Sequence, residues 1–443
     1  MLRSLVRFRI RKGPDHVNRA LRYIVHTAFN EVPIYRRLWR SHVQEILSVR
    51  GVHDLQRLPI VQKGDLVRAN LADRLRRGTD IARCVRRGTS GMTGAPIDIL
   101  FGRAEFKYRQ LTLLRRVLAD LGVHRPFRWA EAGAWIPLEQ RSKSVHRGPV
   151  ISLLRLPRSL RPTEQIDALE RFRPDVVSGC PGDLQLVGAE VLRIGHKKVR
   201  PRLVICRGET LRSDVEEILR EAFGCRVTDY YNVQEVGNLA WRCPDHADIM
   251  HPNSDSALLE IVDSHGAPLP ADTEGDVIVT NLTNATMPFV RYALGDRASW
   301  INTESRRCSC GALGPSLSLI QGRSDDFIVL PDGRRLAPRA VDDLVMETFH
   351  ASPQTAMFLT GIHAYQVIQK APDHLVVVIE VSSPPPMLLA EAMQRGLRVH
   401  HRELVVEFKF VDELPRGTTG KIRRVVSAVE RDQPPFRQDR EPG

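Results

Sequence analysis

Apolar residues near the N-terminus recur at the spacing of one helix face. Val17, Leu21, Ile24 and Ala28 follow this period, and Pro33 comes after them as a stop. Residues 105–121 also read as a helix, which Gly122 closes. The pattern predicts one packed N-terminal helix and a second long helix before the middle of the chain.

Short apolar runs alternate with helical stretches between residues 171 and 229. The runs cover residues 175–178, 202–206 and 226–229, and the helical stretches cover 183–194 and 213–223. Such alternation predicts βαβ units with a largely parallel sheet. Ligands of open α/β sheets bind beyond the carboxyl ends of the strands, where Gly208-Glu209 and Tyr230-Tyr231 follow.

The pattern changes after residue 256. Runs at 257–262 and 276–280 predict a β-rich subdomain, and the polar break 322–326 precedes a separate α+β unit. That unit has predicted helices at 340–349 and 387–398 and predicted strands at 374–381 and 403–411. We therefore expect an α/β chain with an N-terminal domain at 1–321, a C-terminal domain at 322–430 and a disordered tail at 431–443.

Composition narrows the class of protein. A chain of 443 residues is long enough for two or three domains. The net charge of +13 and the pI near 9.7 suit anionic small molecules, while only 6% aromatic residues argue against a nucleic-acid surface. Seven scattered cysteines predict no disulfide framework and a reducing cytoplasm. No apolar run is long enough for a membrane span, so a membrane partner is not expected.

The stretch RRGTSGMTGAP, residues 86–96, combines three glycines with three hydroxyl side chains. Glycine lets backbone N–H groups approach a ligand, and Ser and Thr add donors, so this composition suits an anion-binding loop. It is not a Walker A loop, because no Gly-Lys-Ser/Thr follows at the required spacing. An ordinary turn remains the alternative at this point.

Two pairs of closely spaced residues, one Cys/His and one Cys/Cys, form a candidate metal site. Cys243 and His246 are separated by two residues, and Cys308 and Cys310 by one. Three thiolates and an imidazole suit tetrahedral zinc in a closed structural site with no catalytic role. His251 is a rival to His246 as the fourth ligand, and free thiols near turns are the alternative.

Six stretches occur in an order that resembles the motif series of adenylate-forming enzymes. They are RRGTSGMTGAP, RGET (207–210), DYYNVQE (229–235), MPFVRYALGD (287–296), GRSDD (322–326) and LPRGTTGKIRR (414–424). The chain most resembles the phenylacetate:coenzyme A ligase-like branch, which includes coenzyme F390 synthetases and capsule or antibiotic biosynthesis proteins and also contains similar Cys/His pairs. The resemblance implies a large N-terminal adenylation domain, a small mobile C-terminal lid, and ATP between them.

The resemblance assigns roles to single residues. Those that would hold the departing pyrophosphate are Thr89, Ser90, Gly91, Thr93 and Gly94. Those at the adenine site are Gly208, Glu209 and Tyr231. Glu235 would bind Mg²⁺, with a solvated loop carboxylate as the alternative. Asp296 would accept hydrogen bonds from the ribose hydroxyls, and Arg323 would bind the ribose or phosphate. The alternative is that the two form a structural ion pair.

Two further roles concern the lid. Asp325 matches the hinge about which the lid rotates, and Lys421 would stabilise the charge on the reacting carboxylate and α-phosphate. Three positions depart from the family pattern. Ala95 stands where the family often has Lys, and Asn232 and Gln234 replace the usual Gly and Ser/Thr. The cation for the chemistry is therefore expected from Lys421 and Mg²⁺.

The expected activity is the ATP- and Mg²⁺-dependent adenylation of a carboxylic acid, aromatic by resemblance only, with transfer to coenzyme A. Residues 129–136, with Cys206, Arg207 and residues 232–234 nearby, are expected to form the acid pocket. One alternative hands the acyl group to an acceptor other than coenzyme A. Another is a basic, non-catalytic binding or scaffold protein on the same fold. A homodimer is the assembly to test.

Overall fold

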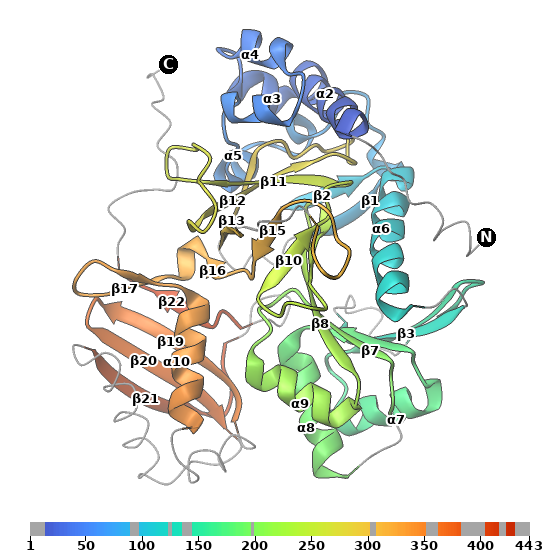
Figure 1. Cartoon of the computed structure of the whole chain (residues 1–443), viewed down its shortest axis with the longest axis vertical. Helices are drawn as coiled ribbons and strands as arrows, with labels where there is room; N and C mark the ends of the chain where they lie inside the picture. Colours follow the sequence, from blue (N-terminus) through green and yellow to red (C-terminus); the bar gives the residue numbers. More distant parts are fainter. Residues whose placement is uncertain are drawn as a thin grey trace. The chain divides into compact units, whose positions relative to one another are not determined.

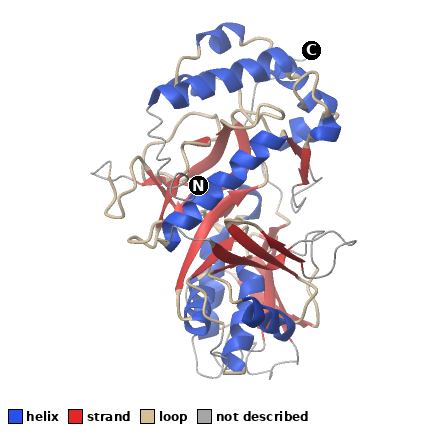
Figure 2. Cartoon of the chain, turned by 90° about the vertical axis from the view of Figure 1, so that its right-hand side faces the viewer, coloured by secondary structure: helices blue, strands red, loops and turns tan. Residues whose placement is uncertain are grey.

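The computed structural model describes residues 14–88, 97–122, 126–134, 144–195, 199–301, 307–350, 362–381, 404–415 and 422–429. Figure 1 labels the helices and strands along the chain. The chain divides into two compact units. The first contains residues 1–124, 230–320 and 433–443, and the second contains residues 125–229 and 321–432. The element order mixes helices and strands along the chain, and Figure 2 shows both kinds of element, which confirms the α/β class. The division expected at residues 321 and 322 stays a prediction, and the tail 431–443 lies outside the described residues.

The first unit begins with short helices that pack on one long one. Their bounds are α2 Pro14–Glu31, α3 Pro33–Leu38, α4 Val43–Ser48 and α5 Lys63–Arg68. The predicted apolar face of α2 is buried at Leu21, Ile24 and Ala28. Pro33 not only ends the preceding helical pattern but also starts α3, because proline fits the first helical position, where its missing N–H is not needed.

Helix α6 (Arg103–Leu121) starts two residues before the predicted position and ends as predicted. Glu105 fixes its start, because Oε2 accepts the Gly102 N–H at 2.7 Å while Oε1 accepts the Ala285 and Thr286 N–H groups. Gly122 closes the helix with φ of +62°, a left-handed conformation that glycine adopts without strain.

Antiparallel strands complete the first unit. The hairpin is β1 (Val85–Gly88) with β2 (Asp98–Phe101). One ladder runs β8 (Arg226–Val233), β9 (Gly237–Arg242), β10 (Ile249–Pro252), β15 (Ser316–Ser318) and β14 (Trp300–Ile301). The other contains β11 (Ala257–Val262), β12 (Gly275–Asn281) and β13 (Tyr292–Ala298). The strands predicted at 257–262 and 276–280 are confirmed, and β8 carries the chain between the two units.

The second unit contains the predicted parallel sheet. Its strands are β3 (Phe127–Ala134), β5 (Ile151–Pro157), β6 (Val176–Gly179) and β7 (Leu203–Arg207), with β4 (Ser144–Arg147) antiparallel at the edge. Its helices are α7 (Pro162–Phe172), α8 (Pro181–Arg193) and α9 (Ser213–Phe223). The alternation predicted from residue 171 is therefore confirmed, and α9 has the predicted bounds.

The two faces of this sheet differ in chemistry. Side chains alternate along a strand, so Ala130, Val177, Val204 and Cys206 share one face. That face forms an apolar core with residues of α7, α8 and α9. The intervening positions therefore belong to the opposite face, and they include several polar side chains close to the carboxyl ends of the strands.

The rest of the second unit is a smaller α+β arrangement. It contains β16 (Gly322–Arg323), η5 (Ser324–Asp326), β17 (Ile328–Val329), β18 (Arg335–Leu336) and α10 (Pro338–His350). A four-stranded sheet follows, in the order β21 (Val405–Val411), β20 (His374–Val381), β19 (Ile362–Ala371) and β22 (Val425–Ser427). The helix predicted at 340–349 and the strand at 374–381 are confirmed, as is the strand at 403–411 from Val405 onward.

The helix expected at 387–398 lies outside the described residues. Among the residues that are described, no helix combines the length and the apolar character that crossing a membrane requires.

Candidate active site

Tyr231 and Asp296 meet in the first unit, although 65 positions separate them in the sequence. Tyr231 lies on β8 and Asp296 on β13, and the phenol hydroxyl donates a hydrogen bond to Asp296 Oδ2 at 2.6 Å. The tyrosine is 9% exposed and packs in the apolar core, while the aspartate is half-buried. The structure thus joins the side chain predicted for adenine to the one predicted for ribose.

Glu235 occupies the turn between β8 and β9, and its side chain is half-buried. Asn281 Nδ2 donates to the Glu235 carbonyl oxygen at 3.3 Å. Arg109 on α6 donates to the carbonyls of Val233 and Val236, at 3.4 and 3.2 Å, so it holds both sides of the turn. No local pattern indicates this role, because Arg109 lies 127 positions before Val236.

Arg109 also explains the glycine that starts β9. Gly237 has φ of +118°, and a Cβ added to it would lie 2.8 Å from Arg109 Nε. A larger residue would therefore be strained by its backbone conformation and would displace the arginine. The turn that carries Glu235 is therefore held by the Arg109 side chain and by the backbone conformation of Gly237.

Gly208 and Glu209 follow the carboxyl end of β7 in the second unit. Gly208 has φ of +85°, a conformation that suits glycine. A Cβ added to Gly182, at the start of α8, would lie 3.5 Å from Glu209 Oε2 and 3.9 Å from Arg424 Nη2. Glu209 therefore lies close to the first turn of α8 and to an arginine of the last predicted motif.

An ion pair lies beside Glu209. Arg158 Nη2 donates to Asp183 Oδ2 at 2.5 Å. Burial lowers the pKa of Arg158, but the carboxylates of Asp183 and Glu209 outweigh it and raise that pKa above its ordinary value. Glu209, which is predicted to lie at the adenine site, thus belongs to a charged cluster at the carboxyl ends of the parallel strands.

The lid residues are placed only in part. Arg323 is half-buried on β16, and Asp325 lies in the single turn of η5. Its neighbour Asp326 accepts a hydrogen bond from Arg423 Nε at 2.6 Å. Lys421 lies outside the described residues, and so does the predicted phosphate loop with Thr89, Ser90, Gly91, Thr93 and Gly94. The Arg423–Asp326 pair links the predicted hinge to the segment that follows Lys421.

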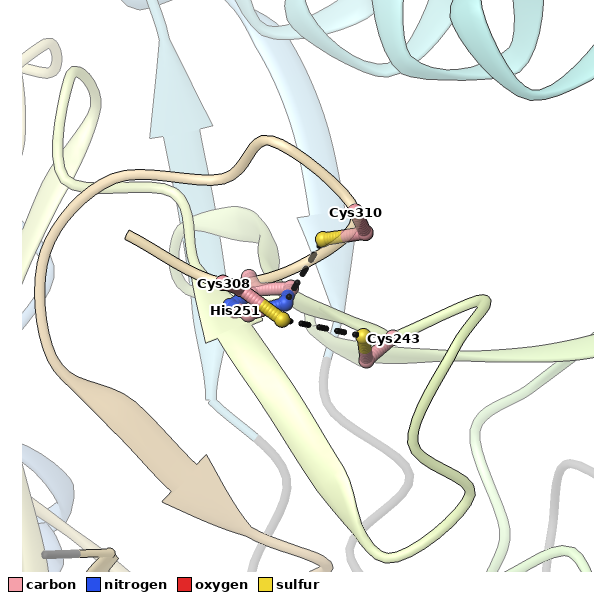
Figure 3. A group of neighbouring side chains, drawn as sticks. All are labelled: Cys243, His251, Cys308 and Cys310. Atoms are coloured by element: carbon pink, nitrogen blue, oxygen red, sulfur yellow. Dashed lines mark hydrogen bonds between the residues drawn. The ribbon is translucent and has the colours of Figure 1, made fainter. Parts of the chain in front are cut away.

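Four metal-ligand side chains converge in the first unit (Figure 3). Their ligand atoms, from Cys243, His251, Cys308 and Cys310, all lie within 4.8 Å of one another. Cys243 Sγ is 3.6 Å from Cys308 Sγ, and Cys310 Sγ is 3.2 Å from His251 Nε2. Tetrahedral zinc with these ligands places sulfur atoms roughly 3.8 Å apart. The donor set and its spacing fit a closed zinc site.

The structure favours His251 over His246 as the fourth ligand. His251 lies on β10, and its Nε2 points toward Cys310 (Figure 3). His246 Nε2 instead contacts the Ser309 hydroxyl at 3.1 Å and is not one of the four converging residues. The expectation of His246 is corrected, because the antiparallel pairing of β9 and β10 brings His251 to the thiols while His246 contacts Ser309.

Hydrogen bonds and burial shift the pKa values of two cysteines in this cluster. The backbone N–H groups of Asp245 and His246 donate to the Cys243 thiol, yet burial dominates and raises its pKa to about 12. Burial also opposes ionisation of Cys308, but the Cys310 N–H and the neighbouring thiols lower its pKa. Backbone N–H groups directed at sulfur would stabilise a thiolate if a metal were bound here.

The predicted acid-pocket residues lie on opposite faces of the parallel sheet. Trp129 donates its indole N–H to Ser178 Oγ at 2.7 Å, and the Arg207 guanidinium lies 5.9 Å from the Trp129 ring. Cys206 was expected nearby, but it is fully buried in the core beneath the helices. Cys206 and Arg207 point to opposite faces because they are consecutive residues of one strand, and the acid pocket itself stays a prediction. Residues 135 and 136 lie outside the described chain.

Comparisons with known proteins agree with this fold. No model of a protein family matches the chain. A phenylacetate-coenzyme A ligase from Thermus thermophilus is 25% identical over 442 residues, covering 92% of this chain and 94% of that protein. A phenylacetate-coenzyme A ligase from Escherichia coli strain K12 is 24% identical over 359 residues, covering 75% of this chain and 76% of that protein. A 2-hydroxyisobutyryl-CoA ligase structure in the postadenylation state has a TM-score of 0.73 at 19% identity, covering 95% and 90%.

A second solved structure, an anthranilate CoA ligase with anthranoyl-AMP, has a TM-score of 0.55 at 18% identity, covering 79% of this chain and 67% of that one. At these identities the structural likeness establishes the fold. The fold is that of the adenylate-forming enzymes, with a large N-terminal and a small C-terminal domain. The similarity to phenylacetate-coenzyme A ligases over most of the chain agrees with the resemblance found in the sequence.

Proposed function

We propose that the protein activates a carboxylic acid with ATP as an acyl-adenylate and transfers the acyl group to coenzyme A. The observation that carries the proposal is the Tyr231–Asp296 hydrogen bond, with Glu235 in the turn that ends the same strand. The names of the curated relatives support an AMP-forming acid–thiol ligase and an aromatic acid.

The chemistry has two steps. A carboxylate oxygen of the acid attacks the α-phosphorus of ATP, and the bond to the pyrophosphate oxygen breaks. The sulfur of coenzyme A then attacks the acyl carbon, and AMP leaves. Both steps require an in-line geometry and donors aimed at the charge that develops on oxygen.

The residues of this chain have separate parts in that chemistry. Tyr231 and Glu209 would contact adenine, and Asp296 would accept the ribose hydroxyls. The Glu235 carboxylate is the hard oxygen ligand that Mg²⁺ prefers, and the metal would neutralise phosphate charge. Lys421 would stabilise the reacting carboxylate and α-phosphate, while Asp325 would be the hinge between the two steps.

A pyrophosphate-release assay tests the proposal. Aryl and aliphatic acids are supplied with ATP and Mg²⁺, with and without coenzyme A, and the thioester is measured by mass spectrometry. We expect acid-dependent pyrophosphate release and a coenzyme A thioester. Release without a thioester would point to a different acyl acceptor. No release with any acid would contradict adenylation.

We also propose a structural zinc ion at Cys243, His251, Cys308 and Cys310. The converging ligand atoms and the N–H groups directed at Cys243 support it. When bound, the metal would staple the end of β9 to β10 and to the segment before β15. Metal analysis of the purified protein tests the proposal, and a preparation that is fully folded without zinc would contradict it.

A cytoplasmic location and a homodimer complete the proposal. None of the seven cysteines, all of them within the described residues, forms a disulfide, which supports a reducing compartment. Fractionation of the source cells tests the location, and light scattering of the purified protein tests the dimer.

A further inference from the structure

Three charged side chains form a cluster on the polar face of the parallel sheet in the second unit. Glu131 lies on β3, Arg155 on β5 and Arg207 at the end of β7. The register places Glu131 opposite both Arg155 and Ser178, so these side chains share the face away from the helices. Arg207 Nη2 donates to Glu131 Oε1 at 2.5 Å, and Arg155 Nε donates to Oε2 at 3.0 Å.

The cluster carries one positive charge more than its carboxylate neutralises. The side chains of Glu131 and Arg207 are only 19% and 25% exposed, whereas that of Arg155 is 47% exposed. Within the described part of the chain, Glu131 is the only residue to which Arg207 donates. A guanidinium has five N–H donors, and one-quarter of the Arg207 side chain is exposed, so it can donate to a further anionic or polar oxygen that approaches from this face.

The position of the cluster suggests what that oxygen belongs to. Arg207 directly precedes Gly208 and Glu209, which are predicted to lie at the adenine of the acyl-adenylate. The site also lies near the carboxyl ends of parallel strands, where open α/β sheets bind ligands. Trp129 adds an indole ring beside the guanidinium, which provides an apolar surface next to the charge.

We propose that Arg207 determines substrate specificity by binding a second oxygen-bearing group of the acid, a carboxylate or a hydroxyl remote from the reacting carboxylate. The proposal rests on the proposed function. Glu131 and Arg155 hold the guanidinium in place and are positioning residues. The substrate class is therefore an acid with two polar ends.

Matched pairs of acids test the proposal. Benzoate is compared with benzene-1,3-dicarboxylate, phenylacetate with 4-hydroxyphenylacetate, and butyrate with glutarate, by pyrophosphate release with the full-length protein. A hydrogen bond to a charged group contributes about 1.5–3 kcal/mol, which corresponds to a roughly 10- to 150-fold preference. We expect a preference of this size in kcat/KM for the acid with the second group in at least one pair.

Substitutions then assign the preference to Arg207. Arg207→Met keeps an unbranched side chain and removes the N–H donors, so it should abolish the preference, mainly by raising KM for the acid that carries the second group. Arg207→Lys should restore part of the preference. Arg193→Met removes an exposed arginine that pairs with Glu190 on α8, and it is the matched control with no expected effect.

Each outcome decides the proposal. If Arg207→Met does not fold because Glu131 has lost its main partner, the double variant Glu131→Gln/Arg207→Met is used instead, since it removes both charges. Equal turnover of both members of every pair by the wild type would overturn the specificity role and leave adenylation intact. An equal loss for all acids in Arg207→Met would show that Arg207 serves the reacting carboxylate instead. No pyrophosphate release from any acid would overturn the proposed function, and the specificity role with it.

Discussion

The Tyr231 hydroxyl donates a hydrogen bond to Asp296 Oδ2 at 2.6 Å and thereby connects β8 to β13. Hydrogen bonds to a carboxylate are stronger than those between neutral groups, and this one fixes the orientation of a half-buried side chain. If Asp296 binds ribose, the tyrosine sets the geometry of the nucleotide site through its hydroxyl as well as through its ring.

Tyr231→Phe separates these two contributions. The variant keeps the ring and removes the hydrogen bond, so we expect KM for ATP to rise about three- to tenfold and stability to fall by about 1 kcal/mol. Steady-state kinetics and urea unfolding measure the two effects. Tyr23→Phe, at an exposed tyrosine of α2, is the control. An unchanged KM for ATP would contradict the link between the hydroxyl and the nucleotide.

The proposed zinc site predicts that one thiol controls metal content. Cys308→Ser removes one of four ligands, so bound zinc should fall from about one equivalent to near zero and the melting temperature should drop by several degrees. Elemental analysis and thermal unfolding measure both. Cys84→Ser, outside the cluster, should change neither. Full zinc content in Cys308→Ser would contradict the assignment.

Local signals in the sequence were sufficient for many elements. Helix α9 was predicted with its observed bounds, because its apolar period is regular and Gly224 ends it with φ of +60°. Strand β11 was predicted equally well, since its apolar run stands between polar turns. Period and turn chemistry act over a few residues, so they are readable without the fold.

Features that depend on contacts between distant parts of the chain could not be predicted from the sequence. The close spacing of Cys243 and His246 suggested a ligand pair, but the antiparallel register of β9 and β10 brings His251 opposite Trp241 and next to the thiols. Arg109 holds the Glu235 turn from a helix far away in sequence. Such contacts depend on topology, and no local pattern encodes them.

The Glu131 carboxylate should make the free energy of unfolding fall at acid pH. Burial would raise its pKa, but Arg207 and Arg155 outweigh burial and lower the pKa below the ordinary value for glutamate. A carboxyl whose pKa is lower in the folded state stabilises the protein above its unfolded pKa, near 4.3. That contribution is lost as the pH falls through the folded-state pKa.

Glu131→Gln removes this pH dependence. At pH 7 it leaves two arginines without their carboxylate, so we expect a loss of about 3 kcal/mol in unfolding free energy, and a smaller difference from wild type near pH 4. Urea unfolding across this pH range measures the curve. Asp332→Asn breaks an exposed ion pair and should have little effect. A loss in Glu131→Gln that is constant with pH would contradict the argument.

Lys421 is predicted to supply the cation that the phosphate loop lacks at Ala95. Lys421→Ala should reduce acid-dependent pyrophosphate release by at least about a hundredfold, because a donor aimed at the developing charge is lost, and it should leave the melting temperature unchanged. If the lysine serves adenylation alone, the variant should still convert a supplied acyl-adenylate to the coenzyme A thioester. Lys409→Ala, at an exposed lysine of β21, is the matched control. Acyl-adenylate formation near the wild-type rate in Lys421→Ala would refute the role and return the search for the cation to Arg323 and Arg424.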